Sequence, residues 1–261
     1  MFDRARPLDP QQVPSRDAFD RRWVGPGRPG IFDGAVAHWR ALREWTPEAL
    51  AARYRDVRLD AYRTRGGELV FDARTGLTSD EVTLGELLAE MRAGTAVRRV
   101  RHRDLARLPG LEEDAPAPVL CAGRLRLEPN LWISAAGTRS RLHFDQPHTL
   151  LVQVHGTKRV LLFAPSERRN VYPNPPWSAN AQFSRADVAR PDLAAFPRLA
   201  RARALRCTLA PGQALFIPGS WWHYLDSEEP TISLGFRWWG TRHLPRLVAA
   251  ELYKTLRGHT R

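Results

Sequence analysis

The chain has 261 residues, and 40 basic side chains against 28 acidic ones give it a formal net charge of +12. A hydrophobic fraction of 43% and nine Trp are enough to build a core, which excludes wholesale disorder. The length fits one large domain or two small ones. Only Lys158 and Lys254 among the basic residues are Lys and the others are Arg, so each lysine calls for a reason.

Composition excludes several protein classes. No apolar run approaches the ~18 residues of a membrane span, and the first residues do not start a signal peptide. We therefore expect no membrane association and a cytoplasmic location. Cys121 and Cys207 are too few for a disulfide scaffold or a cysteine-based zinc site. The basic charge would suit nucleic acid, but the arginines are spread along the chain and lack interleaved aromatics, so a solvated basic surface is the simpler interpretation.

The N-terminal part of the chain is predicted to be mainly helical. Residues 1–20 are polar and Pro-rich, which indicates a loosely ordered segment, and residues 21–118 form a helical or α+β extension. The Thr-Pro-Glu run at 46–48 predicts a helix start, with an N-cap, a proline at the first helical position and an acid in the first turn. The capping box at 83–86 begins a second helix that ends at Gly94. Both helices are interpreted as structural.

From about residue 119 the pattern changes to short apolar runs between Gly and Pro turns, which is typical of a sandwich or barrel. The predicted strands are Leu131–Ser134, Thr149–Val154, Arg159–Phe163, Leu205–Leu209, Ala214–Ile217 and Thr231–Trp239. We place a β core at 119–240, with a Pro- and Asn-rich insert at 164–204. The segment 241–261 predicts a C-terminal helix, whose apolar face would pack on the core or form a homodimer.

A His-x-Asp pair is the first sign of chemistry. In an extended strand residues i and i+2 point to the same face, so His143 and Asp145 can reach one metal ion. Further along the chain, His223 follows a strand and a tight turn. Two His and one carboxylate form the facial triad of non-haem Fe(II) oxygenases, which leaves three coordination positions open. Such ligands could also serve zinc hydrolysis.

Lys158 is the second sign of chemistry. It follows the His155-Gly156 turn, and we expect it on the neighbouring antiparallel strand. A compact ammonium on a flexible stem suits one buried carboxylate. A zinc hydrolase would not explain this residue.

These motifs resemble those of the JmjC/cupin-type Fe(II)- and 2-oxoglutarate-dependent oxygenases. The chain is most similar to the small hydroxylases, which include the asparaginyl hydroxylase of hypoxia-inducible factor and the JmjC arginyl hydroxylases. The similarity is carried by Leu131–Ser134, Ser140–Asp145, Leu150–Pro165, Leu209–His223 and Phe236–Trp239, and it covers most of residues 13–240. The resemblance implies a mostly β fold with flanking helices: a double-stranded β-helix (jelly-roll or cupin) core, an N-terminal α/β extension and a C-terminal helix.

The resemblance also implies a role for each site residue. His143, Asp145 and His223 would bind Fe(II). Lys158 and Ser140 would pair with the distal carboxylate of 2-oxoglutarate. Trp132 and Thr149 would line the cosubstrate pocket. O2 would be the second cosubstrate.

Two positions depart from the family pattern. Thr149 stands where these hydroxylases commonly have Asn, and Gly235 stands where a polar residue often contacts cosubstrate or substrate. Both departures leave the substrate open. His148 is near enough in sequence to touch a substrate, and of Trp221 and Trp222 we expect one in the core and one at the pocket.

Three functions are consistent with these residues. The first is a hydroxylase of a side chain in a peptide or protein, and the second is a hydroxylase of a small molecule or a tRNA nucleoside. The third is a non-catalytic metal-binding cupin module, against which the intact metal and lysine positions argue. Histone demethylation would use the same iron chemistry, but we rank it low because no chromatin-reader or zinc module is visible.

Overall fold

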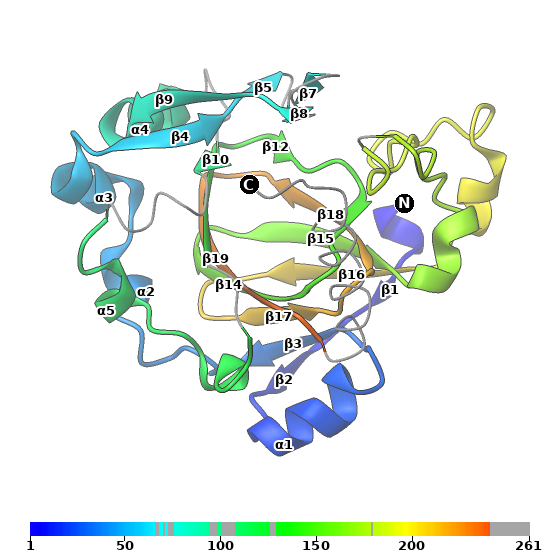
Figure 1. The fold of residues 1–261 in the computed structure, drawn as a ribbon, viewed down its shortest axis with the longest axis horizontal. Coiled ribbons are helices and arrows are strands. Elements are labelled where there is room, and N and C mark those ends of the chain that lie inside the picture. The colour runs from blue at the N-terminus through cyan, green and yellow to red at the C-terminus, as the bar shows by residue number, and fades with distance from the viewer. Residues whose placement is uncertain are drawn as a thin grey trace, which may run out of the picture.

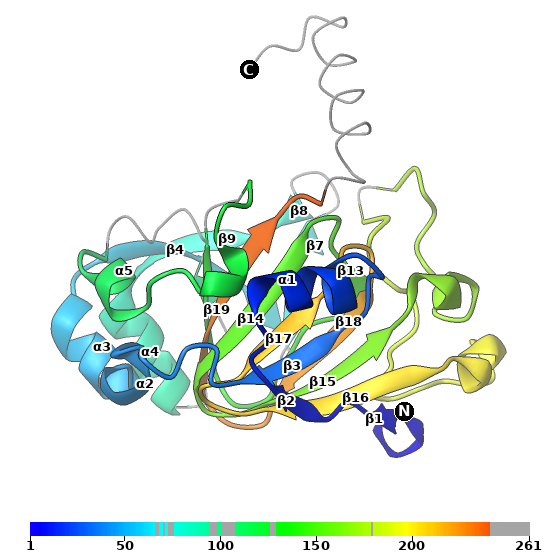
Figure 2. The ribbon, with the colours of Figure 1, turned by 90° about the horizontal axis from the view of Figure 1, so that it is seen from below.

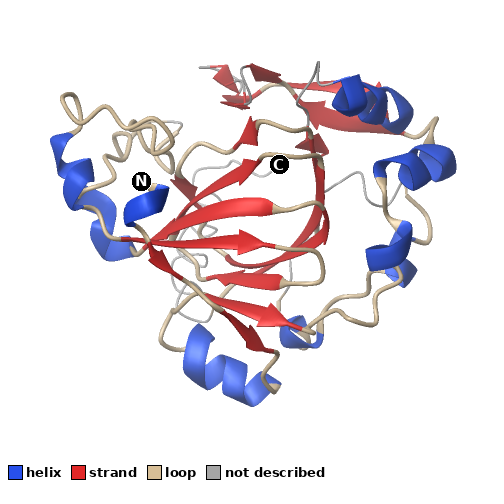
Figure 3. Cartoon of the chain, turned by 180° about the vertical axis from the view of Figure 1, so that it is seen from behind, coloured by secondary structure: helices blue, strands red, loops and turns tan. Residues whose placement is uncertain are grey.

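The computed structural model describes residues 1–65, 68–69, 71–72, 76–93, 99–100, 108–125, 129–178 and 180–240. Two sheets form its centre, and helices lie around them, as Figure 1 and the reverse view in Figure 3 show. The segment 241–261, with the predicted C-terminal helix and its homodimer face, lies outside the described residues. No helix in the described ranges combines the length and apolarity that crossing a bilayer requires.

The two central sheets, here called sheet A and sheet B, have six strands each. Sheet A contains, in spatial order, β1 (Arg6–Pro7), β16 (Ala204–Leu209), β15 (Lys158–Phe163), β18 (Trp222–Ser227) and β12 (Thr138–Arg139), and β13 (His143–Phe144) also pairs with β18. Sheet B contains β11 (Asn130–Ser134), β19 (Thr231–Trp238), β14 (His148–His155), β17 (Ala214–Ile217), β3 (Gly30–Asp33) and β2 (Pro10–Gln12). All six predicted strands are confirmed, and no end is displaced by more than one residue.

Successive core strands cross from one sheet to the other, as in a jelly roll. Strand β14 lies in sheet B, β15 and β16 in sheet A, β17 in sheet B, β18 in sheet A and β19 in sheet B. This topology confirms the predicted fold class. It corrects the expected position of Lys158, because β15 is in the sheet opposite β14 instead of paired with it. The chain changes sheets at the turn after His155, where Gly156 has a φ of +65°.

Side chains alternate between the two faces of each strand, so each face has its own partners. The outer face of sheet B packs on the N-terminal helices, the outer face of sheet A packs on the N-terminus and the insert, and the inner faces pack on each other. Leu150 and Phe216 lie on the outer face of sheet B, and Leu161 and Phe163 lie on the outer face of sheet A. Val160 and Leu215 lie on the inner faces. The inner faces enclose the space in which the site is built.

The N-terminal extension supplies the helices and a small third sheet. The helices are α1 (Arg16–Phe19), α2 (Ala41–Glu44), α3 (Pro47–Tyr54), α4 (Leu84–Ala93) and α5 (Leu111–Asp114). The third sheet has the order β10 (Arg99–Val100), β4 (Arg58–Tyr62) and β9 (Ser79–Thr83). Two separate strand pairs join β5 (Thr64–Arg65) to β6 (Glu68–Leu69) and β7 (Phe71–Asp72) to β8 (Gly76–Leu77). Short 3-10 helices occupy 2–4, 119–121, 165–169 and 197–201, and a π turn occupies 20–24.

Both predicted helix starts are confirmed by their caps. The Thr46 hydroxyl accepts a hydrogen bond from the Ala49 N–H at 3.1 Å. In the capping box, the Glu86 N–H donates to Thr83 Oγ1 at 3.1 Å, and the Thr83 N–H donates to the Glu86 carboxylate at 2.8 Å. These bonds satisfy backbone donors that a helix start leaves without intrahelical partners.

Residues 1–20 are paired and packed, which corrects the expectation of a loosely ordered segment. Strand β1 pairs with β16, and β2 pairs with β3, both in parallel. Phe19 on α1 is completely buried in the core under sheet B. A polar, Pro-rich sequence is what an edge strand tolerates, because one side of its backbone needs no sheet partner. Figure 2 shows these N-terminal strands beside the sandwich, so the β core extends beyond 119–240.

Candidate metal centre and cosubstrate pocket

Three potential metal ligands meet at the end of sheet A. Strand β13 pairs with β18 so that His143 lies directly opposite His223. One ligand atom from each of His143, Asp145 and His223 lies within 4.8 Å of the other two. The His223 Nε2 to Asp145 Oδ2 distance is 3.9 Å, and the centroids of the two imidazole rings are 4.2 Å apart. The structure therefore brings together the three residues that the sequence singled out.

Backbone carbonyls orient both imidazoles. His143 Nδ1 lies 2.7 Å from the Arg141 carbonyl oxygen, and His223 Nδ1 lies 3.0 Å from the Trp221 carbonyl oxygen. A carbonyl can only accept, so each Nδ1 carries the proton and each Nε2 keeps its lone pair. Metal-binding histidines typically use their second ring nitrogen in this way. The two rings are thus held in the tautomer that coordinates through Nε2.

The Asp145 carboxylate is electrostatically prepared for a cation. Burial opposes its ionisation, but His143, His223 and Arg237 favour the charged form, and together they hold the pKa of Asp145 below its usual value. Its main-chain carbonyl accepts a hydrogen bond from the Ser220 N–H at 2.7 Å. Ser220 has a φ of +68°, in the left-handed region that non-glycine residues rarely adopt, so a strained turn holds this aspartate in place.

The insert at 164–204 forms one wall of the metal centre. Phe183 makes a β-bridge with His143, and their rings stack with centroids 5.2 Å apart. The neighbouring Ser184 N–H donates to the Leu142 carbonyl at 2.8 Å, and the Phe144 N–H donates to the Gln182 carbonyl at 3.0 Å. Residues 182–184 thus extend sheet A beyond β13. This contact was not predicted, because the insert shows no strand pattern in the sequence.

Buried polar side chains gather on the facing sides of the two sheets, where the cosubstrate pocket is expected. Lys158 is only 5% exposed, and its ammonium donates to the Ser233 hydroxyl at 2.6 Å, a bond that joins sheet A to sheet B. Trp132 lies opposite Ser233 on β11, and Thr149 lies opposite Arg237 on β14. The inner face of β19 is therefore polar or small at every position, although the strand is buried.

Two further polar groups face this pocket without hydrogen-bond partners. The Thr149 hydroxyl and the Arg237 Nε are both buried and unpaired. Buried donors without partners are rare and costly in folded proteins. Both atoms are donors, as is the ammonium of Lys158, so the pocket presents a set of groups suited to carboxylate oxygens.

Comparisons with known proteins agree with this geometry. A family model described as a cupin-like domain matches residues 16–243. Jumonji C domain-containing protein 5 of Drosophila melanogaster is 30% identical over 245 residues, which cover 87% of this chain and 58% of that protein. Lysine-specific demethylase 8 of Xenopus tropicalis is 30% identical over 232 residues, which cover 87% of this chain and 51% of that protein. HSPB1-associated protein 1 of Rattus norvegicus is 42% identical over 115 residues, which cover 43% of this chain and 24% of that protein.

The chain belongs to the family of proteins with a cupin-like domain, and it is similar to Jumonji C proteins. Oxygenases of this group use Fe(II), 2-oxoglutarate and O2. The His143, Asp145 and His223 cluster fits a metal of this kind, with two imidazoles and one carboxylate. The buried donors beside it fit a dicarboxylate. The chain spans little more than half the length of its Drosophila and Xenopus relatives.

The two departures from the Jumonji C pattern have structural consequences. At Gly235, an added Cβ would make an ordinary van der Waals contact, 3.4 Å from the Trp132 indole nitrogen, so the polar side chain of the family pattern would lie beside that ring. At Thr149, a hydroxyl replaces the expected amide and stays buried without a partner. Both changes lie on the inner face of sheet B, where they shape the pocket without touching the metal ligands.

Ser140 has a partner that the sequence did not indicate. Its hydroxyl accepts a hydrogen bond from the Leu225 N–H at 2.8 Å. Ser140 is buried, and this bond ties the segment before β13 to β18. The residue therefore holds the strand that carries His143. Its expected pairing with a cosubstrate carboxylate stays a prediction.

Other candidates from the sequence lie away from the pocket. His148 packs in the core between Phe216 and Trp238, and its Nδ1 accepts a hydrogen bond from the Gly219 N–H at 2.9 Å. The interpretation of His148 as a substrate contact is therefore wrong. Trp222 is buried against Phe144, which confirms one tryptophan in the core. Trp221 is partly exposed and lines a different cleft, so its expected place at the cosubstrate pocket is not confirmed.

Proposed function

We propose that the chain hydroxylates an amino-acid side chain in a peptide or protein, with Fe(II) bound by His143, Asp145 and His223. The observation that carries the proposal is the fixed tautomer of both imidazoles, which leaves two Nε2 lone pairs beside one carboxylate. A surface His–Asp cluster would not need both Nδ1 atoms tied to carbonyls. The depressed pKa of Asp145 supports the same role, because a metal ligand must be deprotonated.

The cosubstrate in this proposal is 2-oxoglutarate, and Lys158 pairs with its distal carboxylate. On β15, Leu162 lies opposite His223, and Lys158 is four residues away from Leu162. Four residues of extended strand correspond to about 13 Å. A five-carbon diacid together with the lysine stem can bridge a gap of this size. Thr149 and Arg237 supply further donors for carboxylate oxygens, and Trp132 flanks the pocket. Ser140 supports the arrangement by holding the strand of His143.

The chemistry is divided between the bound groups and the chain. When bound, iron and 2-oxoglutarate activate O2, and the overall reaction inserts one oxygen atom into a substrate C–H bond and releases succinate and CO2. The residues of the chain orient the ligands, neutralise the cosubstrate and exclude water. Lys158 does this from a buried position, where a charge-assisted hydrogen bond is strong. No side chain is needed as a general base.

The choice of substrate has alternatives. A small molecule or a tRNA nucleoside would use the same iron chemistry, and the name of the Xenopus relative favours removal of an N-methyl group as a second candidate. Oxidation of an N-methyl carbon gives an unstable product that loses formaldehyde. Peptide hydroxylation is placed first because the site motifs of this chain resemble those of the side-chain hydroxylases.

The proposal is tested by succinate release from peptides, free amino acids and tRNA, with mass spectrometry of the products. A gain of one oxygen atom supports hydroxylation, and a loss of one methylene unit with formaldehyde supports demethylation. His223→Ala should abolish release, whereas His38→Ala, which removes an exposed histidine elsewhere, should not. Iron-loaded protein that binds 2-oxoglutarate but never forms succinate would instead support a non-catalytic module.

A further inference from the structure

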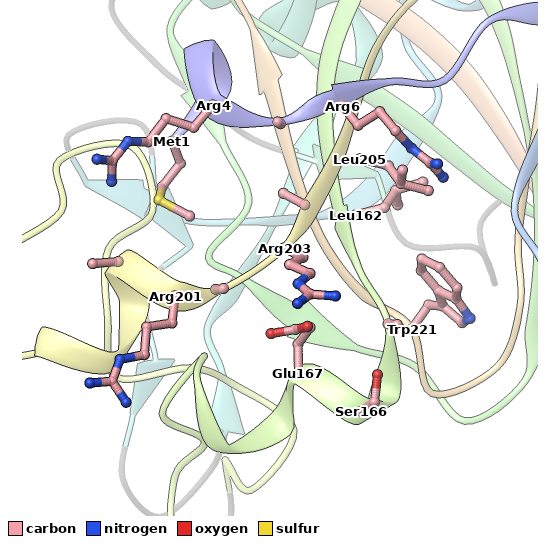
Figure 4. A pocket seen from close by; sticks show the side chains of 15 residues that line it. Met1, Arg4, Arg6, Leu162, Ser166, Glu167, Arg201, Arg203, Leu205 and Trp221 are labelled. Carbon is pink, nitrogen blue, oxygen red and sulfur yellow. The ribbon is translucent and has the colours of Figure 1, made fainter.

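A cleft of about 740 Å³ opens at the edge of sheet A, away from the cosubstrate pocket. Its walls come from the N-terminal segment, β16, and the parts of the insert near 166 and 201. Four of its lining residues are arginines, namely Arg4, Arg6, Arg201 and Arg203 (Figure 4). None of the functions assigned above uses this cleft.

A continuous row of residues links the cleft to the metal centre. Arg6 on β1 lies opposite Leu205, and Leu205 lies opposite Leu162. Leu162 in turn lies opposite His223, which lies opposite His143. Residues opposite each other in a sheet share a face, so all five side chains belong to the inner side of sheet A. Three strand spacings separate Arg6 from His223, which amounts to about 14 Å.

The arginines of the cleft outnumber its one lining carboxylate, Glu167. Within the described part of the chain, none of these four side chains lies within ion-pair distance of a carboxylate, and all four are exposed. Other arginines do have such partners, as in the pairs Arg53–Asp114 and Arg159–Glu228. Four unpaired guanidinium groups around one concave surface attract anions and are well shaped for carboxylates.

The remaining lining residues indicate which kind of anion fits. The floor contains Leu162, Leu205 and Trp221, which can cover the apolar parts of a peptide. Glu167 stands among the arginines and offsets part of their charge. The Trp221 indole N–H donates to the Gly27 carbonyl at 2.9 Å, which fixes this ring in the wall of the cleft.

We propose that this cleft binds acidic side chains of the peptide or protein substrate and so positions the residue that is oxidised. This inference rests on the proposed function. Leu162 in the middle of the row is fully buried, so a bound peptide has to pass around it. Because an extended peptide advances about 3.3 Å per residue, the distance of about 14 Å places the acidic residues at least about four positions from the oxidised one. Recognition by charge at that distance selects substrates without taking part in the chemistry.

The test compares two double variants with the same change in net charge. Arg201→Glu with Arg203→Glu alters the cleft, and Arg21→Glu with Arg190→Glu alters exposed arginines elsewhere. Fluorescence anisotropy is measured with a labelled glutamate-rich peptide, a peptide in which lysine replaces each glutamate, and labelled oligothymidylate. We expect the wild type to bind the glutamate-rich peptide, and the cleft variant to bind it at least about tenfold more weakly. The control pair should bind as the wild type does.

Three results would overturn the inference. The first is no binding of the glutamate-rich peptide, and the second is an equal loss in both variants, which would reflect net charge alone. The third is tighter binding of oligothymidylate that the cleft variant loses, which would assign the surface to nucleic acid. The same titration with His143→Ala should be unchanged, because the cleft lies outside the metal centre. Peptide binding without succinate release would therefore count against the proposed function and leave the cleft assignment standing.

Discussion

The two sides of the sandwich interior differ in what fills them. Toward β16, β17 and β3 the inner faces carry apolar side chains that pack against each other. Toward β19 and β11 the inner faces carry polar ones. Representative residues are Ile31, Leu209 and Leu215 on the first side and Asn130, Ser233 and Arg237 on the second. The apolar side packs on itself, whereas the polar side contains buried donor and acceptor atoms without hydrogen-bond partners, among them Arg237 Nε and Asn130 Oδ1.

Removal of a metal ligand should have the largest effect, confined to the polar side. His143→Ala should weaken metal binding by more than the roughly 10–100-fold that loss of a group merely supporting a ligand costs. The imidazole is partly exposed and stacks on Phe183, so the unfolding midpoint should fall much less than for a fully buried apolar side chain. Anaerobic addition of Fe(II) and 2-oxoglutarate should give a weak visible charge-transfer band in the wild type and in His38→Ala only. A band of full strength in His143→Ala would remove this residue from the ligand set.

A cavity on the apolar side should have the opposite profile. Leu215→Ala removes a fully buried side chain and should lower the free energy of unfolding by about 2–5 kcal/mol. The KM for 2-oxoglutarate should stay close to that of the wild type below the unfolding transition. Urea unfolding and succinate release measure the two quantities. If the KM rose as much as in a Lys158 variant, the division between the two sides would be wrong.

Loss of the buried ammonium should act on the cosubstrate and spare the metal. Lys158→Ala should raise the 2-oxoglutarate concentration needed for half-maximal turnover by about 10–100-fold, because a charge-assisted pair in a buried pocket is lost. Lys158→Met retains most of the side-chain volume and should raise the 2-oxoglutarate requirement as Lys158→Ala does. Agreement of the two variants would show that the loss of charge, and not the loss of packing, causes the effect. Arg159→Ala, on the outer face beside it, is the matched control. An unchanged requirement in both Lys158 variants would contradict the role.

The smallest effect concerns Cys207 on the inner face of β16. Burial raises the pKa of its thiol to about 12 from the model-compound value of 9.0. The folded state therefore binds this proton more tightly than the unfolded state, and its contribution to stability is complete below about pH 9 and is lost as the pH rises toward 12. Urea unfolding should show a shallower loss of stability over this range in Cys207→Ala than in the wild type. Parallel profiles would show that the thiol is solvated.

The long β19 shows how much of the site was readable from the chain. Its residues alternate strictly, with Ile232, Leu234 and Phe236 on one face and Thr231, Ser233 and Gly235 on the other. Such alternation usually indicates a strand with one solvated face. Here both faces are buried, so the polar face had to belong to an internal pocket. The pattern was visible, but its meaning depended on whether a second sheet covered it.

Local order was determined by the sequence alone. Helix caps, strand runs and the spacing of His143 and Asp145 depend on neighbours within a few residues, and they were predicted well. The Lys158 position was noticed because lysine is so scarce in this chain. The N-terminal strands were missed, since edge strands rich in Pro and polar residues look like loops.

Only the tertiary structure decided which distant segments meet. Register between strands places His223 opposite His143 and Phe183 beside His143. Packing of the two sheets places the Lys158 ammonium on Ser233 of the facing sheet. Strand register also aligns Leu162 and Leu205 between His223 at the metal centre and Arg6 at the sheet edge. These pairings are set by how two sheets pack over residues far apart in the chain, and packing of that kind leaves no local signal.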